Sequence, residues 1–281
     1  NTAMGNGALN NLTTTAGNTA FGKVALESSV TGSYNTAVGY QSLQSCLDGG
    51  HNVGVGWKAL YANTSGAGNA AVGVYALDAN TTGGYNVGIG YNALGANTTA
   101  GNNIAIGNGA LAANTTAEEN VAIGSSALQA MVGGTGKNYA VGYLALGSVT
   151  TGVSNVGMGY RVGQYVTGIT TGDRNVIVGN YSRTSAVDSV DQLIFGYDVT
   201  GYSDRTFTFG NAGNDTTIGF GNTSWSAPSD ERLKEEITTS TAGLSFVNDL
   251  RPVTFKWKKE KDIPTDLAGY VEGSEKRYKT D

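Results

Sequence analysis

Few residues in this chain could do chemistry through a metal, a thiol or an imidazole. Its 281 residues include one histidine, His51, and one cysteine, Cys46. A structural zinc site needs about four Cys or His ligands, and a disulfide within the chain needs two cysteines. We therefore interpret both as loop residues of one repeat, and we expect the chain to require no metal and no cofactor.

Carboxylates that could serve as acid and base are also sparse in the first two thirds of the chain. A glycan-cleaving centre usually needs two suitably placed carboxylates. The acidic residues in question are scattered over the sequence: Glu27, Asp48, Asp78, Glu118 and Glu119. Their spread argues against a glycan-degrading tailspike.

The overall composition indicates an ordered, repetitive protein. Glycine contributes 43 residues and proline three, charged residues make up 14%, and the formal net charge is −5. Disordered chains are poor in aromatic residues, whereas this chain has 15 tyrosines. Nucleic-acid surfaces need clustered Lys and Arg, and a membrane span needs roughly 20 apolar residues in a row. The sequence offers neither, so we expect no nucleic-acid partner and no membrane insertion.

One short box recurs along the chain, in forms such as NTAVGYQSL and NVGIGYNAL. Its copies start at Asn1, Asn18, Asn35, Asn52, Asn69, Asn86, Asn103, Asn120 and Asn138. Subtracting neighbouring starts gives a period of 17 residues, except for the last interval of 18. Two looser copies start at Asn155 and Asn175, and both lack the leucine that otherwise ends the box.

This period predicts an all-β solenoid. It is too short for the helix pairs of common repeat proteins, and the spacers are rich in the turn-forming residues Asn, Thr and Gly. We expect two short strands in each coil, one in the N-x-A-V-G box and one around x-A-L. Because stacked strands lie about 4.8 Å apart, eleven coils would form a rod roughly 50 Å long.

Alternation within the box predicts which side chains share a face, because successive residues of a strand point opposite ways. One face carries small residues, such as Ala37 and Gly39 beside Asn35, and would allow a thin roll. The other carries bulky apolar residues such as Val121 and Ile123. A strand without a polar face is normally covered on both sides, so we expect two further copies of the chain to cover it. The asparagines would either form a ladder of amides or only supply a tolerant turn residue.

The boxes NIAIG at Asn103 and NVAIG at Asn120 resemble the head repeats of trimeric autotransporter adhesins. The resemblance covers residues 1 to about 192. It implies a left-handed parallel β-roll that packs as a homotrimer.

The repeat ends near Gln192, and the sequence that follows has two parts. Residues 193–225 contain the alternating stretches LIFGYDV, RTFTFG and TTIGFG, which predict strands of a β connector or stalk. From Ser226 onward Lys, Arg and Glu become frequent. We therefore predict three regions: a shaft over 1–192, a connector over 193–225, and a small α+β segment over 226–281.

The stretch SDERLKEEITTSTAGLSFVNDLRPVTFKWK, from Ser229 to Lys258, resembles the start of the S74 peptidase family. This family is the C-terminal intramolecular chaperone of phage tail fibres and tailspikes. The resemblance implies a module that trimerises, templates the folding of the fibre before it, and then cuts itself off. It implies Ser229 as the nucleophile, Lys234 as its base, and a cut between Pro228 and Ser229.

The chemistry of this pair is plausible in itself. Serine needs a neighbouring base to remove its proton, and no histidine lies near Ser229 in the sequence. A lysine can serve when burial lowers its pKa from about 10.4. Alternatively, Ser229 is only a helix N-cap and Lys234 a solvated helix residue. The family's chaperone continues well past Trp257, so we expect this chain, which stops at Asp281, to be a piece of a longer one.

We interpret the chain as a structural tail fibre or host-attachment protein of a virus, folded by an intramolecular chaperone that removes itself. It would be assembled in the host cytoplasm, and it would lie on the extracellular surface of the virion beside other tail proteins. Its enzyme activity is at most a single-turnover self-cleavage without an external substrate. A host cell-surface glycan or protein would be the receptor. The alternative is a cellular surface adhesin without peptidase activity.

Aromatic side chains are the residues of the shaft that could contact a sugar directly. Such residues are Trp57, Tyr61, Tyr75 and Tyr85. Aromatic rings can stack on sugars, although scattered surface aromatics are common without any ligand. The sequence alone does not name a receptor.

Overall fold

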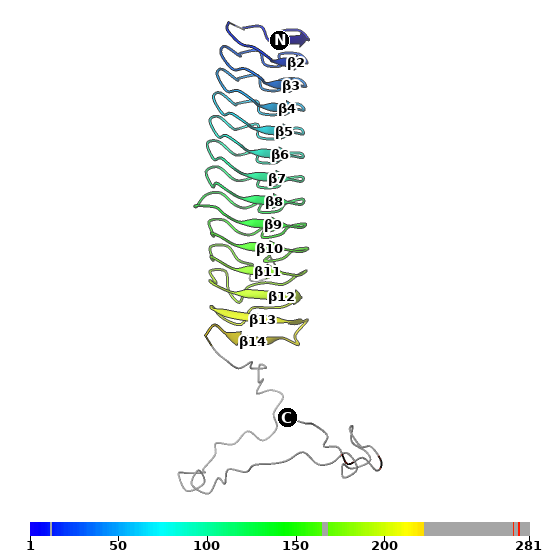
Figure 1. Ribbon diagram of the computed structural model, residues 1–281, viewed down its shortest axis with the longest axis vertical. Helices are drawn as coiled ribbons and strands as arrows, with labels where there is room; N and C mark the ends of the chain where they lie inside the picture. Colours follow the sequence, from blue (N-terminus) through cyan, green and yellow to red (C-terminus); the bar gives the residue numbers. More distant parts are fainter. Residues whose placement is uncertain (12, 165–167, 222–271, 273–274, 276–281) are drawn as a thin grey trace. The chain divides into compact units, whose positions relative to one another are not determined.

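The computed structural model describes residues 1–11, 13–164, 168–221, 272 and 275. Within these residues every element is a β-strand and none is a helix. The chain divides into two compact units, Asn1–Ser229 and Asp230–Asp281. The first unit is a stack of coils with one strand in each (Figure 1). The α+β segment expected at 226–281 lies outside the described residues, apart from 272 and 275.

The strands of the stack are short and evenly spaced. They are β1 Thr2–Met4, β2 Thr19–Phe21, β3 Thr36–Val38, β4 Val53–Val55, β5 Ala70–Val72, β6 Val87–Ile89, β7 Ile104–Ile106, β8 Val121–Ile123, β9 Tyr139–Val141, β10 Val156–Met158, β11 Val176–Val178, β12 Leu193–Tyr197, β13 Thr206–Asn211 and β14 Thr216–Gly219. The strands predicted from the N-x-A-V-G box and from the three connector stretches are therefore confirmed.

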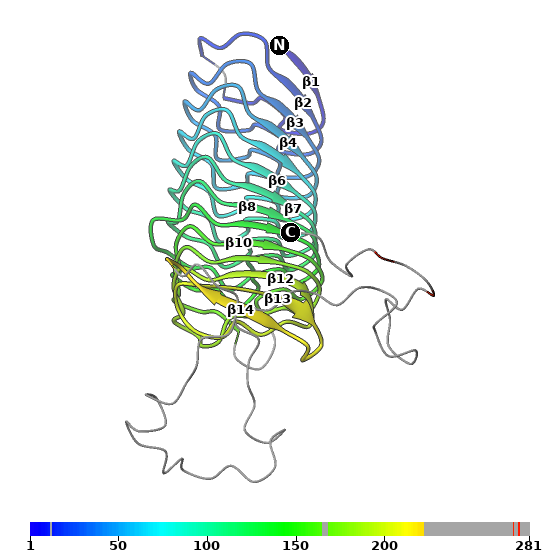
Figure 2. The ribbon, with the colours of Figure 1, turned by 60° about the horizontal axis from the view of Figure 1, so that its bottom comes forward.

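All strands belong to one sheet, in which their order follows the chain. The pairs from β1 to β13 are parallel and in register, so Val87 of β6 lies beside Ile104 of β7. The result is a parallel β-solenoid of about 12 turns, seen from a second side in Figure 2. The last strand, β14, pairs antiparallel with β13. This reversal ends the parallel stack.

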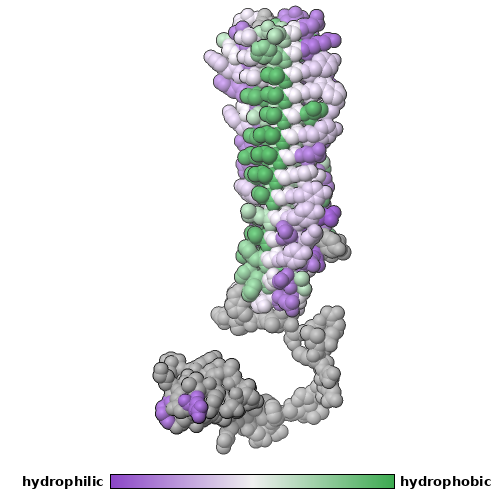
Figure 3. All heavy atoms as spheres, turned by 90° about the vertical axis from the view of Figure 1, so that its right-hand side faces the viewer, coloured by the Kyte–Doolittle hydropathy of each residue, from purple (hydrophilic) through white to green (hydrophobic). Residues whose placement is uncertain are grey.

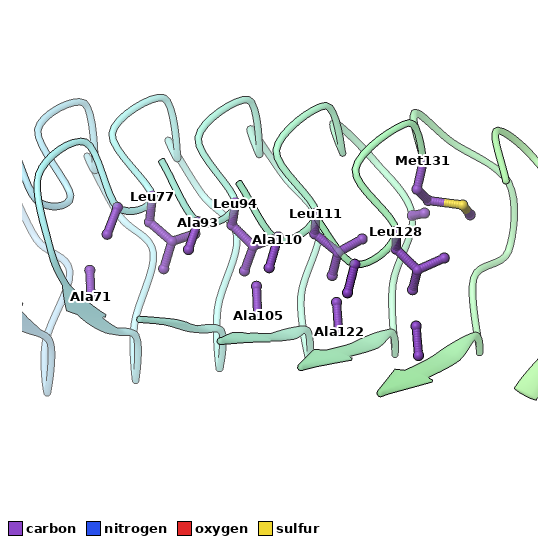
Figure 4. Close-up of a cluster of buried hydrophobic side chains, with 14 of the residues drawn as sticks. Ala71, Leu77, Ala93, Leu94, Ala105, Ala110, Leu111, Ala122, Leu128 and Met131 are labelled. Atoms are coloured by element: carbon purple, nitrogen blue, oxygen red, sulfur yellow. The ribbon is translucent and has the colours of Figure 1, made fainter. Parts of the chain in front are cut away.

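The core of the solenoid is thin because small residues face large ones across each coil. The middle residue of each strand points inward and is usually Ala or Gly, as at Ala105 and Gly88. Leucines from the opposite side of the coil, such as Leu94 and Leu111, are fully buried against them (Figure 4). A Cβ on Gly88 would already lie 3.3 Å from Leu77. The predicted thin roll is confirmed, with the small face inward.

The prediction of a second strand around x-A-L is wrong. These leucines have a left-handed backbone, for example φ 53° at Leu77 and φ 54° at Leu94. The chain therefore curves here, although its backbone still bonds to the next coil, as from Leu77 N–H to the carbonyl of Ala93 at 3.0 Å. A left-handed leucine costs about 1–2 kcal/mol. Burial of the side chain offsets that cost.

The coil that starts at Asn155 shows how the core adapts when the leucine is lost. Gly163 stands at the leucine position, and a Cβ there would meet Ile169 and Ile177 at 3.3 and 3.5 Å. Both isoleucines are fully buried. Ile177 takes the inward position of its strand, where the preceding coils have Ala or Gly. The large side chain therefore comes from the strand and not from the leucine position, and the interior stays filled.

The box asparagines form a buried ladder along the stack. The Asn86 side-chain amide donates to the carbonyl of Ala100 at 2.8 Å, and its Oδ1 accepts the backbone N–H of Asn103 at 3.0 Å. The Asn103 amide also donates to the same Oδ1 at 3.3 Å. Most box asparagines thus join the two ends of their own coil and contact the next coil; Asn120, at the start of the 18-residue coil, instead donates to the carbonyl of Glu118 at 3.1 Å. The predicted amide ladder is confirmed.

A second amide ladder was not predicted. Asn63, Asn80, Asn97 and Asn114 are fully buried. The Asn80 amide donates to Oδ1 of Asn63 at 2.8 Å and to the carbonyl of Gly83 at 2.9 Å. Its signal in the sequence is the Asn of the NTT spacers, which recurs with the same period. The other residues of this register are Ser29 and Cys46 before the ladder and Met131, Val149 and Ile169 after it.

We predict that Asn86→Ala weakens the shaft because it removes the partner of the Asn103 N–H and leaves the Ala100 carbonyl with the Asn97 amide alone. Unsatisfied buried groups cost about 1–3 kcal/mol, so urea unfolding should shift to lower concentration. Asn108→Ala is the control, since Asn108 is exposed, and it should change stability by less than about 0.5 kcal/mol. Equal effects of the two substitutions would contradict the role of the ladder.

Candidate functional site

The predicted catalytic pair and cleavage site lie outside the described residues. This applies to Pro228, Ser229 and Lys234. Their roles therefore stay predictions from the sequence. The described residues that bear on function lie on the surface of the shaft.

The most extensive feature of that surface is an apolar stripe made by the outward side chains of the strands (Figure 3). We call it the outer strand face. Its central row consists of the third residues of β2 to β12 and of Phe209, the residue of β13 that pairs with Phe195: Phe21, Val38, Val55, Val72, Ile89, Ile106, Ile123, Val141, Met158, Val178, Phe195 and Phe209. All are at least partly exposed, for example 39% for Ile89 and 48% for Met158. A continuous exposed apolar stripe of this length is typical of an interaction surface.

The aromatic side chains considered as sugar contacts occupy two places. Trp57, Tyr61 and Tyr75 lie together, just after the strands and beyond the glycine turn, and Lys58 lies over all three rings. Tyr85 lies apart, just before a strand, and is 71% exposed.

Two of the scattered carboxylates, Glu27 and Asp78, stay apart in the structure. Glu27 and Asp78 occupy the same position in coils three repeats apart, so about 14 Å separates them along the stack. That exceeds the separation in glycosidase pairs, which reaches about 9.5 Å. Glu27 accepts a hydrogen bond from Gln44 at 2.6 Å, and burial raises the pKa of Asp78. This arrangement gives no support to a glycosidase centre at these two residues.

Charged residues at one edge of the later coils pair from coil to coil. The Arg174 guanidinium donates twice to Asp191, at 2.7 and 3.1 Å, and Arg205 lies 4.0 Å from the same carboxylate. Arg174 therefore lowers the pKa of Asp191. Both arginine side chains are more than half exposed and that of Asp191 is 27% exposed, so solvent screens these pairs and each adds little stability.

A polar cavity of about 360 Å³ opens where one coil gains its eighteenth residue. Its lining residues are Thr116, Glu118, Glu119, Gly134, Thr135 and Lys137. Lys137 Nζ lies 3.8 Å from a Glu119 carboxylate oxygen, and the Lys137 N–H donates to the Glu118 carbonyl at 3.2 Å. The added residue is thus accommodated in a surface turn.

The two residues considered for metal or thiol chemistry have different surroundings. His51 is exposed and stacks on Tyr34, with ring centroids 5.1 Å apart. Cys46 lies outside the strands but is buried, and its Sγ donates to the Gly49 carbonyl at 3.2 Å. In the described part of the chain, no three His, Cys, Asp or Glu side chains gather as metal ligands. The same residues include no helix with the length and hydropathy for crossing a bilayer.

Comparison with protein families finds one match. Residues 229–270 match the peptidase S74 model, described as chaperone of endosialidase. This agrees with the resemblance of the SDERLK stretch, and this part of the chain therefore carries such a domain. No curated protein and no solved structure matches the chain significantly.

We predict that the Cys46 thiol does not react in the folded protein. We also predict that Cys46 lowers the free energy of unfolding at alkaline pH. Burial raises the pKa of its thiol from 9.0 to about 11. As the pH rises, the thiol therefore ionises in the unfolded chain before it does in the folded protein. The stability that the protonated thiol contributes is complete below pH 9 and is lost between pH 9 and 11. Wild type should lose up to about 3 kcal/mol relative to Cys46→Ser over this window.

Cys46→Ser is a matched control because Ser29 occupies the same register in the neighbouring coil. Unfolding free energies of both proteins at pH 8 and pH 10.5 would measure the difference. A thiol reagent should modify wild type only after denaturant is added. Parallel pH profiles, or fast modification of the native protein at pH 8, would show that the thiol is accessible.

Proposed function

Because residues 229–270 carry a chaperone of endosialidase domain, we propose that this chain is the shaft of a trimeric viral tail fibre. The domain match and the solenoid support this proposal together. In this role the shaft projects from the virion and contributes to attachment at a host cell-surface glycan or protein. The fibre is assembled in the host cytoplasm and joins other tail proteins.

The exposed, apolar outer strand face is the observation that best supports a trimer. Its side chains repeat once per coil, so it fits best against a surface with the same repeat. A second and a third copy of this chain, parallel and in register, provide that surface. An apolar row that runs from Phe21 to Phe209 would then be removed from water, which stabilises the assembly by about 25 cal/mol for each Å² buried.

Self-cleavage follows in the same proposal from the SDERLK stretch. Ser229 Oγ attacks the carbonyl carbon of Pro228, and Lys234 takes the serine proton and passes it to the Ser229 nitrogen as the peptide bond breaks. Pro228 is then held as an ester on Ser229, and water hydrolyses this ester and separates the two parts of the chain. The lysine acts only when folding buries it and lowers its pKa. Cleavage therefore follows folding. Loss of the chaperone then removes the template for reversal, and the shaft unfolds slowly.

We predict that Ile89→Lys dissociates the trimer while leaving each coil intact. Three unpaired ammonium groups would be buried together at the interface, at a cost of about 3 kcal/mol or more for each copy. Sedimentation at micromolar concentration should show trimers for wild type and smaller species for the variant. Thr82→Lys adds the same charge at an exposed turn residue and should stay trimeric. A soluble wild-type monomer would refute the proposed assembly.

We predict that a version of the protein with its complete chaperone cuts itself between Pro228 and Ser229. Ser229→Ala and Lys234→Ala should each slow the cut by about 1000-fold or more, because each removes a group that acts in bond cleavage. Both variants should still form trimers. Denaturing gels and intact mass give the cleaved fraction.

Ser226→Ala is the control for this experiment, because Ser226 lies three residues before the proposed nucleophile. It should be cut at the wild-type rate. Normal cleavage of Ser229→Ala would refute the assignment of the nucleophile. Loss of cleavage in Ser226→Ala alone would move the assignment to that serine.

A further inference from the structure

Three aromatic rings contact one another over three consecutive coils, and Lys58 links a fourth ring, that of Tyr61, to them. We call Trp57, Tyr61, Tyr75 and Tyr91 the aromatic strip. The Trp57 and Tyr75 ring centroids are 4.9 Å apart, and those of Tyr75 and Tyr91 are 6.2 Å apart. Trp57 is 43% exposed and Tyr91 55%. The rings therefore contact one another through part of their surface and present the rest to solvent.

Lys58 adds a cation to the strip. Its Nζ lies 6.0 Å from the ring centroid of Trp57, 5.0 Å from that of Tyr61 and 5.9 Å from that of Tyr75. Asp78 is close enough for the charge of Lys58 to influence its pKa. The strip thus combines ring surfaces with one ammonium and one carboxylate group.

The next two coils show that the fold does not need these rings. The registers of Trp57 and Tyr75 carry Asn108 and Gly109 in one coil and Ser125 and Ser126 in the other. The backbone is unchanged: φ is 58° at Tyr75 and 57° at Ser126. Strand pairing also continues in register through these coils. Coil stacking therefore does not explain the aromatic residues.

The strip has the shape and chemistry of a surface for an extended glycan. Its rings follow one another along the shaft at the spacing of the coils, about 4.8 Å, which is close to the length of one pyranose ring. Aromatic surfaces take up apolar C–H faces, and polar groups at their edge fix orientation. Lys58 and Asp78 can donate to and accept from sugar hydroxyls.

We propose that the aromatic strip binds a linear polysaccharide that runs parallel to the shaft axis. This inference rests on the attachment role proposed above and assigns a place to the receptor contact. Trp57, Tyr75 and Tyr91 contact successive sugar rings, which turn along the glycan because the aromatic planes differ by 48° and 88°. Lys58 and Asp78 bond to their hydroxyl groups. A neighbouring copy covers the outer strand face, and the strip lies beyond the glycine turn that ends each strand.

A second aromatic row in the same register has a different character. The rings of Tyr143, Tyr160, Tyr181 and Tyr197 lie 5.2 to 5.9 Å apart from coil to coil. The first two are stacked at 21°, so their faces cover each other. This row contains no tryptophan. It serves as the comparison for the aromatic strip.

The test uses substitutions for which other coils provide a precedent. The strip variant combines Trp57→Ser, Tyr75→Ser and Tyr91→Ser, as Ser125 and Ser126 stand in those registers. One control is Tyr85→Ser, since Ser154 occupies its register with φ 59°. The other control is Tyr143→Ser in the second row. Sedimentation should show the same oligomer for all four proteins.

Binding would be measured by affinity electrophoresis in gels that contain a neutral β-glucan, a chitin-derived glycan or the uronate polymer alginate. These three arms distinguish neutral, N-acetylated and acidic sources of the ligand. We expect at least one polysaccharide to retard wild type and both controls. The strip variant should bind about tenfold more weakly or worse, because it loses three aromatic contact surfaces at once.

Each other outcome overturns the proposal. Retardation of the strip variant equal to wild type, or loss of binding in Tyr143→Ser, would place the glycan elsewhere. No binding of wild type to any of the three would exclude the strip as a glycan surface, while a trimeric mass would leave the proposed shaft standing. Dissociation of the strip variant would mean that the rings contact a neighbouring copy.

Discussion

The amide of the first asparagine in each repeat is the interaction on which the rest of the structure depends. Its Oδ1 holds the N–H of the next box asparagine, and in the described copies other than the one at Asn120 its Nδ2 holds a carbonyl near the end of the same coil, as Asn86 holds Ala100. Both bonds form only when the chain returns to the same place after one coil. The extra residues of longer coils must therefore leave the box in register, as the bond from Asn138 N–H to Asn120 Oδ1 at 3.0 Å shows.

This constraint leaves little room inside the coil and makes the outside apolar. Because the coil is narrow, a strand that faces a leucine places a small residue inward, such as Ala105. The bulky residues of the same strand, Ile104 and Ile106, then point outward. A stack of such coils has an apolar outer face that it does not cover itself. Assembly with further copies of the chain is the consequence that we propose, and the chaperone domain supports it.

Much of this fold could be predicted from the sequence because the repeat is visible in the letters. The box predicted where the strands lie, and the alternation of Ala with Val or Ile predicted which side chains share the inward face. The left-handed backbone at Leu77 could not be predicted, since a leucine has no local preference for that conformation. Packing inside the coil selects it. The ladder through Asn80 was missed because asparagine is also the usual residue of an exposed turn.

The candidate sites differ in how far the sequence could define them. Ser229 and Lys234 came from the resemblance of a short motif, which the family match supports as a domain without testing the pair. The aromatic strip could not be recognised from the sequence, because its residues are separated by coil lengths. Only the fold brings Trp57, Tyr75 and Tyr91 into one row. Their significance then follows from comparison with the coils that lack them.

Methionine oxidation would test most directly whether other copies cover the outer strand face. Met158 lies on that face and is 48% exposed in a single chain, whereas Met131 is fully buried inside its coil. Peroxide converts accessible methionine to the sulfoxide, and peptide mass spectrometry follows both residues in the assembled protein. The account predicts that Met158 is protected to the same degree as Met131. Oxidation of Met158 at the rate of the unfolded chain, with Met131 still protected, would contradict it.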